Sequence, residues 1–331
     1  MIPLPMDHAS TTPAVTGRVS VIMPCYNGER FIAQAIDSFL AQTHANKELI
    51  VVDDGSTDRS VEIVRGYGDA VRLITQPNLG PSAARNRGLH TATGEFIAFL
   101  DADDWWEPNF LEAMVSALEG SGAVLAYCGW QIVLADGSTR PPFVPPDYET
   151  PQKRVTLLSN ASLWPIHGML TRRADLLKLH GFDEKLLMCE DYDLWLRLTF
   201  TRPIVRVAQV LAYYRHHKPL ADSDKRGRDA EWLRRIKKAF IAAHPSEVAD
   251  IPREVLRDCV DGGFMRRGYQ CYWNRELRSA RRIFRTAFLA GAFTRKDLRY
   301  VLPALLPESA YLSLITRADG RDHSSDATKP G

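Results

Sequence analysis

Apolar residues follow two alternating spacings in the first part of the chain. Short apolar runs that contain β-branched residues predict strands, and they cover residues 19–24, 48–54, 71–75 and 96–100. Between them, apolar residues recur every three or four positions, which predicts helices; these segments cover residues 31–43, 59–67 and the stretch that begins at Pro81. Strands that alternate with helices predict right-handed βαβ units and a mainly parallel sheet.

Further along the chain the pattern becomes mixed. An apolar run at 123–134 predicts a strand, and the proline-rich residues 141–151 predict a surface loop, because proline cannot pair inside a sheet. Residues 190–200 have the spacing of an amphipathic helix, and 204–217 predict another strand. We therefore predict one α/β domain with a mixed sheet over residues 18–220.

From residue 221 onwards the pattern is helical and basic. Residues 1–224 carry 20 Lys and Arg against 27 Asp and Glu, whereas residues 225–331 carry 22 against 13. We predict a disordered lead-in at residues 1–17 and the α/β domain at residues 18–220. A basic helical extension would follow at residues 221–318 and a disordered tail at residues 319–331.

The composition narrows the class of protein. With 45% hydrophobic and 25% charged residues and no run of 18 apolar residues, the chain resembles a soluble globular protein without a membrane-spanning helix. Its five cysteines form no CxxC pair, which argues against a zinc site or a disulfide framework and favours a reducing compartment. The N-terminal residues lack the pattern of a secretion signal. We therefore expect a cytoplasmic protein.

Polar residues follow three of the predicted strands. In an open parallel sheet, ligands bind beyond the carboxyl ends of the strands. The first strand is followed by PCYNG at 24–28, the second ends in Asp53 and Asp54, and the fourth is followed by DADD at 101–104. Because arginines lie in the nearby helix start at 82–88, this pattern favours a nucleotide bound through its phosphates.

The acids after the fourth strand predict a cation site. Asp101 and Asp103 are two positions apart, so on an extended backbone their side chains point the same way. Two carboxylates without imidazole or thiolate form an oxygen-rich site that suits Mg²⁺ or Mn²⁺. The structural alternative is that Asp103 or Asp104 caps the next helix, which Pro108 is expected to start. Three acids after a buried strand favour the cation site.

Five motifs together resemble the family 2 inverting glycosyltransferases, which have the GT-A fold. The motifs are VSVIMPCYNGERFIAQAIDSFLAQT, ELIVVDDGSTD, NLGPSAARNRG, GEFIAFLDADD and GFDEKLLMCEDYDLWLRL. Each alone is a weak signal, but they occur in the order and spacing of the family over residues 18–217. The resemblance implies a nucleotide-binding half at about 18–120 and an acceptor half at about 121–220.

The resemblance also implies roles for individual residues. It implies that Pro24, Tyr26 and Asn27 lie along the nucleotide. Asp54 would form a hydrogen bond with the base, and Asp53 would lie nearby. Arg85 would lie near the base and the phosphates, and Asp101 would face the ribose. Asp103 would bind the Mn²⁺ or Mg²⁺ that bridges the diphosphate, and His217 would reach this cation or the leaving diphosphate. Asp191 would be the general base, with Glu190 the next candidate.

Other residues carry weaker expectations. Asp104 and Trp105 follow the cation motif and would lie near the donor sugar, although at least one of Trp105 and Trp106 is expected in the core. Trp195 lies four positions after the candidate base, so it lines either the acceptor site or the core. His167 precedes a predicted strand and is a weaker candidate for the site.

The implied activity is metal-dependent transfer of a sugar from a UDP-, GDP- or dTDP-sugar to a hydroxyl acceptor. The acceptor would be a glycan, a lipid-linked glycan or a small molecule, as in the synthesis of cell-surface polysaccharide or lipopolysaccharide. A module that binds nucleotide sugars or glycans without catalysis is the alternative. A phosphoryl transferase would need a GxxxxGK[ST] loop, which the sequence lacks.

The basic extension admits more than one partner. Lys and Arg on solvated helix faces are common, so we expect no nucleic-acid partner. The apolar spacing favours docking on the catalytic domain, with peripheral contact to an anionic membrane surface as the second interpretation.

Overall fold

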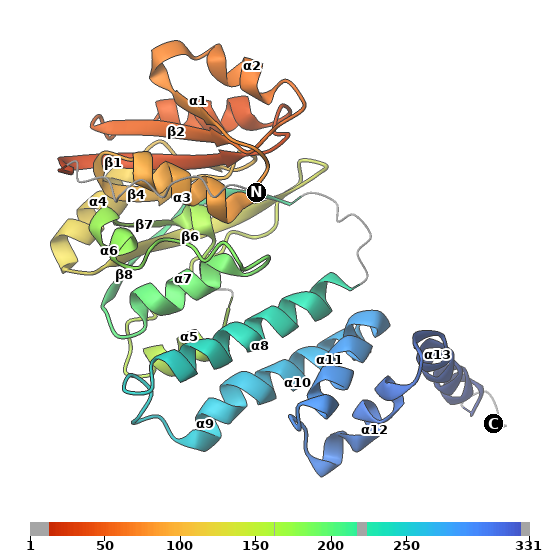
Figure 1. Ribbon diagram of the computed structural model, residues 1–331. Coiled ribbons are helices and arrows are strands. Elements are labelled where there is room, and N and C mark those ends of the chain that lie inside the picture. The colour runs from red at the N-terminus through yellow and green to blue at the C-terminus, as the bar shows by residue number, and fades with distance from the viewer. Residues whose placement is uncertain (1–12, 162, 217–223, 326–331) are drawn as a thin grey trace, which may run out of the picture. The chain divides into compact units, whose positions relative to one another are not determined.

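The computed structural model describes residues 13–161, 163–216 and 224–325. The chain divides into two compact units, residues 1–218 and 219–331. Figure 1 shows a sheet with flanking helices in the first unit and helices in the second. The division lies close to residue 220, where the α/β pattern of the sequence ends.

Four parallel strands form the first half of the sheet. They are β1 (Val15–Cys25), β2 (Lys47–Asp53), β3 (Arg72–Thr75) and β4 (Gly94–Phe99). The helices between them are α1 (Ile32–Leu40), α2 (Ser60–Arg65) and α3 (Pro81–Thr91). β1 pairs with β2 on one side and β4 on the other, and β2 also pairs with β3. The predicted βαβ units are therefore present, with each strand near its predicted position.

The second half of the first unit extends this sheet in mixed directions. Its strands are β5 (Trp105–Trp106), β6 (Leu125–Leu134), β7 (Met169–Arg172) and β8 (Ile204–His216). β7 is antiparallel to β4 and β6, β8 is parallel to β6, and β5 is antiparallel to β8. The eight strands have the order β3-β2-β1-β4-β7-β6-β8-β5. The helices of this half are α4 (Phe110–Ser121), α5 (Lys153–Ser159), α6 (Arg173–Lys178) and α7 (Glu190–Thr199).

Alternate residues of β1 face opposite sides of the sheet. Val19, Val21 and Met23 belong to an apolar core that includes residues of α1 and α4. On the other side, α3 packs so closely on β1 that a Cβ on Gly88 would lie 2.4 Å from Ile22 Cγ2. Only glycine allows this approach. The close packing holds the start of α3 beside the carboxyl ends of the parallel strands.

The second unit has its own apolar core. Its helices are α8 (Lys225–Ala243), α9 (Arg253–Arg257), α10 (Gly263–Trp273), α11 (Leu277–Leu289), α12 (Leu298–Val301) and α13 (Glu308–Ser325). A π-helical segment, Asp258–Gly262, joins α9 to α10. Buried residues such as Phe264, Ile283 and Phe284 form the core. No helix in the described ranges combines the length and apolarity needed to cross a bilayer.

Two predictions about the chain ends need correction. β1 begins at Val15, inside the predicted disordered lead-in, because the Val15 N–H donates to Thr93 O at 2.9 Å and the strand pairs with β4. α13 continues to Ser325, inside the predicted disordered tail. The buried side chains of Tyr311 and Ile315 anchor the first half of this helix, and the backbone hydrogen bonds continue from there.

Candidate active site

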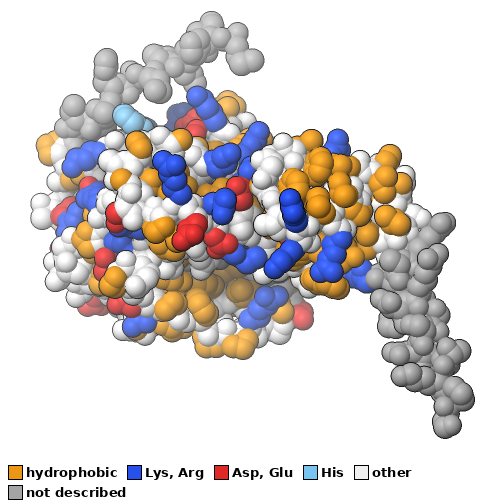
Figure 2. Space-filling view, turned by 90° about the horizontal axis from the view of Figure 1, so that it is seen from below, with side chains coloured by type: hydrophobic (Ala, Val, Ile, Leu, Met, Phe, Trp, Pro, Cys, Tyr) orange, Lys and Arg blue, Asp and Glu red, His pale blue; other side chains and the backbone are white. Residues whose placement is uncertain are grey.

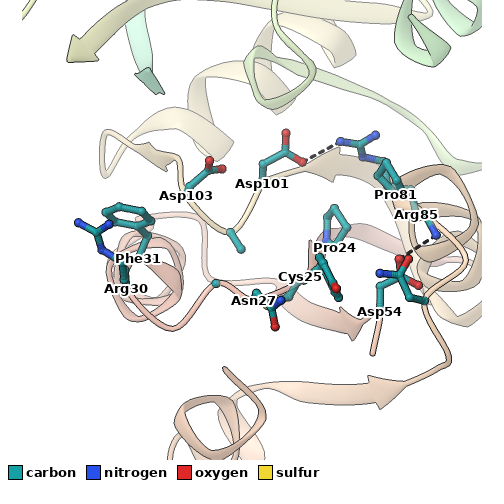
Figure 3. Close-up of a pocket in the computed structure, with 15 residues that line it drawn as sticks. Pro24, Cys25, Asn27, Arg30, Phe31, Asp54, Pro81, Arg85, Asp101 and Asp103 are labelled. Atoms are coloured by element: carbon teal, nitrogen blue, oxygen red, sulfur yellow. Dashed lines mark hydrogen bonds and ion pairs between the residues drawn. The ribbon is translucent and has the colours of Figure 1, made fainter. Parts of the chain in front are cut away.

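A pocket of about 560 Å³ lies at the carboxyl ends of β1, β2 and β4, beside the start of α3. Its lining includes Pro24, Tyr26, Asn27, Asp54, Arg85, Asp101 and Asp103. Figure 3 shows Asp101 between Asp103 and Arg85, above the loop that contains Pro24 and Asn27. The structure thus brings together residues from four separate motifs. Asp53 is buried below this pocket and does not line it.

Asp54 organises the loop that precedes α3. Its Oδ1 accepts hydrogen bonds from Gln76 Nε2 at 2.8 Å and Leu79 N at 2.9 Å, and its Oδ2 accepts one from Gly80 N at 2.8 Å. Gly80 has φ of +94°, a conformation that glycine adopts without strain. Three hydrogen bonds leave one carboxylate lone pair for a ligand. Asp54 therefore shapes one wall of the pocket as well as presenting an acceptor to it.

Asn27 joins the two loops on the other side of the pocket. Its N–H donates to Ser56 Oγ at 2.9 Å, and its Oδ1 accepts from Thr57 N at 2.8 Å. The backbone of Asn27 has φ of +52°, a region that Asn tolerates better than most residues. Tyr26, the preceding residue, is 54% exposed at the mouth of the pocket. The loop thus holds an aromatic face where a ligand enters.

Arg85 links the pocket to the start of α7. Its Nη2 donates to Asp101 Oδ1 at 2.8 Å and its Nη1 donates to Glu190 Oε1 at 2.9 Å, while its side chain is only 6% exposed. Burial by itself lowers the pKa of Arg85, but the Asp101 and Glu190 carboxylates outweigh this effect and raise the pKa. The guanidinium stays charged and connects acids that are 89 positions apart in sequence.

Asp191 has different electrostatics from the other acids of the site. Burial, together with the neighbouring Glu190 carboxylate, raises the pKa of Asp191 to about 6, although the Tyr192 N–H and Arg85 oppose the shift. The Tyr192 N–H donates to Asp191 Oδ1 at 2.7 Å. A carboxyl with a pKa near 6 is ionised at neutral pH and still able to take up a proton, as a general base requires.

Asp101 and Asp103 supply the donor set that a hard cation prefers. Both present carboxylate oxygens to the pocket, and Mg²⁺ or Mn²⁺ sites commonly combine one or two carboxylates with phosphate oxygens and water. Within the described residues, no group of three or more His, Cys, Asp or Glu side chains is arranged to hold a metal ion. The two carboxylates therefore fit a cation that a diphosphate helps to bind.

Asp104 lies behind the pocket. Its Oδ2 is 2.8 Å from His167 Nδ1, and the two side chains are 0% and 1% exposed. Burial lowers the pKa of His167, but the Asp104 carboxylate outweighs burial and raises it. The prediction that Asp104 lies near the donor sugar needs correction, because its carboxylate is enclosed by protein and turned towards His167.

The predicted tryptophans divide between surface and core. Trp105 is half-buried and stacks on Tyr213 at 5.2 Å, whereas Trp106 is buried against Phe110. Trp195 is 1% exposed and packs near Trp164 in the core, so it presents no face to an acceptor. The acceptor-site expectation for Trp195 therefore needs correction in favour of core packing. His217, predicted to reach the cation, lies outside the described residues.

The contacts of two residues near this pocket could not be read from the local sequence. His167 comes from a 3₁₀ turn, Ile166–Gly168, and reaches Asp104 across 63 positions of sequence. Arg215, near the end of β8, lies over the rings of both Phe31 and Trp105. The pairing of β8 with β6 and β5, which joins residues far apart in sequence, brings Arg215 to this place.

Comparisons with known proteins agree with this geometry. The sequence model of glycosyl transferase family 2 matches residues 20–177. The UDP-Glc:α-D-GlcNAc-diphosphoundecaprenol β-1,3-glucosyltransferase WfgD of Escherichia coli is 38% identical over 182 residues, which cover 54% of this chain and 69% of that protein. An uncharacterized glycosyltransferase of Rickettsia typhi is 35% identical over 208 residues, which cover 60% of this chain and 64% of that protein. The chain thus spans a little under two-thirds of that relative's length.

Solved structures share the fold at low sequence identity. TarS of S. aureus aligns with a TM-score of 0.60 and 22% identity over 90% of this chain and 53% of TarS. The mannosyltransferase PcManGT from Pyrobaculum calidifontis, solved with GDP-Man and Mn²⁺, aligns with a TM-score of 0.57 and 20% identity over 96% of this chain and 91% of its own. These likenesses confirm the GT-A fold, and together with the sequence matches they lead to one conclusion: the chain belongs to glycosyl transferase family 2.

Proposed function

We propose that this protein transfers a sugar from a nucleoside diphosphate sugar to a hydroxyl acceptor, with inversion at the anomeric carbon. The observation that carries the proposal is that one arginine forms ion pairs both with an acid of the pocket and with the acid next to the candidate base. Arg85 lies between Asp101 in the pocket and Glu190, the neighbour of Asp191. Asp191 has a pKa of about 6. A nucleotide pocket and a base suited to neutral pH therefore share one charge network.

The proposed reaction needs one proton acceptor. The acceptor hydroxyl donates a hydrogen bond to the Asp191 carboxylate, which takes its proton as the oxygen attacks the anomeric carbon. The new carbon–oxygen bond forms on the face opposite the nucleotide, and the bond to the diphosphate oxygen breaks. The nucleoside diphosphate leaves with the bonding electrons as an anion, so no acid has to protonate it. Glu190 keeps Arg85 directed towards the pocket.

The remaining pocket residues hold the donor. Tyr26 and the free lone pair of Asp54 are proposed to contact the base, and Asp101 the ribose. Asp103, with Asp101, would hold a divalent cation, which supplies charge neutralisation at the diphosphate when bound. Arg85 supplies a fixed positive charge on the same side. The solved PcManGT complex contains Mn²⁺, which supports the choice of this ion for assays.

The donor and acceptor classes are also proposals. UDP-, GDP- and dTDP-sugars are the candidate donors, because backbone and carboxylate groups at the pocket edge can form hydrogen bonds with a purine or a pyrimidine base. Lipid-linked or surface glycans are the proposed acceptors, and WfgD, by its name, acts on an undecaprenol-linked sugar. We propose that the protein works in the cytoplasm, at the inner face of the membrane.

A donor panel tests the proposal. The purified full chain is incubated with each UDP-, GDP- and dTDP-sugar, with and without Mn²⁺, and nucleoside diphosphate release is measured by mass spectrometry. We expect Mn²⁺-dependent release from one donor class, increased by glycan acceptors. A protein that binds the nucleotides but releases no diphosphate from any donor or acceptor combination would instead be a catalytically silent binding module.

A further inference from the structure

Behind the turn that contains Asp103 lies a buried contact between a carboxylate and an imidazole. Asp104 and His167 are at 0% and 1% side-chain exposure, with Asp104 Oδ2 and His167 Nδ1 2.8 Å apart. Burying a carboxylate and an imidazole costs free energy, and an apolar pair of similar volume would pack with no such cost. Packing alone therefore does not account for this pair.

Other contacts fix the same turn in different directions. The second oxygen of Asp104, Oδ1, accepts the Arg215 N–H at 2.8 Å, and Arg215 Nε donates to Asp103 O at 3.1 Å. The Trp106 indole donates to His167 O at 2.6 Å. The Asp103 carbonyl is thus bonded to β8, and the Trp106 side chain is bonded to the 3₁₀ turn that contains His167.

The geometry leads us to propose that His167 is a positioning residue for the cation site. By holding Asp104, it fixes the backbone from which the Asp103 carboxylate projects into the pocket. The proposal rests on the proposed function, because Asp103 is a cation ligand only in that account. Residues that orient a metal ligand without touching the metal commonly change metal affinity by about 10-fold to 100-fold when replaced.

The proposal separates two kinds of nucleotide contact. The Asp54 side chain accepts hydrogen bonds from residues 76–80, and Asn27 forms hydrogen bonds with Ser56 and Thr57. None of these bonds involves His167. Loss of the His167 contact is therefore expected to weaken binding only where the cation contributes. Binding of a nucleoside diphosphate without metal is expected to stay unchanged.

Replacing His167 with asparagine or with glutamine, two amides of similar polarity, provides a matched test. The side-chain nitrogen of Asn overlies Nδ1 of histidine, so His167→Asn keeps a donor towards Asp104. The nitrogen of Gln overlies Nε2 instead, so His167→Gln keeps polarity and size but loses that donor. His44→Gln is the control for replacing a partly buried histidine of the first unit, since His44 bonds Gly17 O at the far end of the strands.

The experiment is calorimetric titration of the full chain with UDP, GDP and dTDP at a series of Mn²⁺ concentrations and without metal. We expect His167→Gln to raise the Mn²⁺ concentration for half-maximal binding by about tenfold or more. His167→Asn and His44→Gln are expected to match the parent, and metal-free binding is expected to be equal in all four proteins.

The outcomes distinguish this inference from the function beneath it. Asp103→Asn is measured in parallel, and if it leaves the Mn²⁺ dependence intact, the proposed cation site is wrong. If Asp103→Asn removes that dependence while His167→Gln and His167→Asn behave alike, His167 is a packing residue and the inference is overturned. An equal loss of metal-free binding in His167→Gln would also overturn it, because that result indicates general disorder of the pocket.

Discussion

Asp191 is separated from the other acids of the site by its immediate surroundings. Asp101 accepts a hydrogen bond from the Arg85 guanidinium at 2.8 Å, and the Asp54 carboxylate accepts three hydrogen bonds. Asp191 has burial and the Glu190 charge against its ionised form, and these raise its pKa. We propose on this ground that Asp191 is the residue that takes up the proton.

The rate of transfer should therefore depend on the ionisation of Asp191. The base works only when deprotonated, so kcat/KM is expected to fall as pH drops through about 6, the pKa of Asp191, and to reach a plateau above it. The measurement is initial rate against pH at low donor concentration and saturating Mn²⁺. A profile that stays flat down to about pH 4.5 would show that a group of ordinary carboxylate pKa, or none, limits the rate.

The same shift makes a prediction about stability. A carboxyl whose pKa is raised in the folded state binds its proton more tightly there than in the unfolded chain, so it opposes folding at pH values above about 6. Asp191→Asn removes this cost and is expected to raise the free energy of unfolding at pH 8 by up to about 3 kcal/mol, which corresponds to a rise in pKa from 3.8 to about 6. The gain should vanish near pH 4, where the carboxyl is protonated. Denaturant titrations at both pH values check this, and an equal gain at each would exclude a titration effect.

Residue roles within the motifs could be predicted only where chemistry is local. Asp101, Asp103 and Arg85 lie in one pocket as the strand-end pattern indicates. Asp104 could not be assigned from its neighbours, because its partner is His167, far along the chain. Trp195 has helical spacing on either interpretation, and only the packing of Trp164 places it in the core.

At the scale of elements, the parallel half of the sheet could be predicted and the mixed half only in outline. Strands β1, β2 and β4 are mostly buried and follow from short apolar runs, as expected for strands covered on both faces. β3, at the edge of the sheet, is shorter and more exposed. The two-residue strand β5 has no periodicity to detect and exists because β8 pairs with it. The order β7-β6-β8 likewise depends on pairings that no local pattern encodes.

The contact between α3 and β1 can be tested with a matched pair of glycines. Gly88→Ala places a Cβ 2.4 Å from Ile22 Cγ2, and overpacking of this kind costs about 1–3 kcal/mol of stability. Gly120→Ala, near the end of α4, meets no atom within 4 Å and is expected to be neutral or slightly stabilising. Thermal unfolding of both variants checks the prediction, and equal melting temperatures would contradict the close approach of α3.

At the scale of the molecule, the acidic catalytic unit and the basic helical unit differ in charge and surface. In the second unit, Leu302, Leu305 and Leu306 are 48%, 39% and 40% exposed, and exposed Arg295, Lys296 and Arg299 precede them. Figure 2 shows Lys and Arg side chains beside exposed apolar ones over part of one face of the molecule. Basic and apolar side chains together suit an anionic membrane surface.

We therefore expect the full chain to float with vesicles that contain an anionic lipid such as phosphatidylglycerol, and not with neutral phosphatidylcholine vesicles. Because each basic residue near the surface contributes about 1 kcal/mol, added salt should weaken the binding. Leu305→Glu should reduce flotation, whereas Leu40→Glu, at an exposed position of α1, should not. Equal flotation with both lipids would contradict the electrostatic preference for an anionic surface, and no flotation with either would contradict membrane contact.

We propose that Asp191 removes the acceptor proton, while the residues that line the pocket bind the donor independently of Asp191. The direct measurement compares the parent protein with Asp191→Asn, recording sugar transfer by mass spectrometry and donor binding by calorimetry on the same samples. The account predicts a loss of transfer of about 10²-fold to 10⁴-fold, with donor affinity close to that of the parent. Transfer by Asp191→Asn at the parental rate, with the donor equally bound, would contradict it.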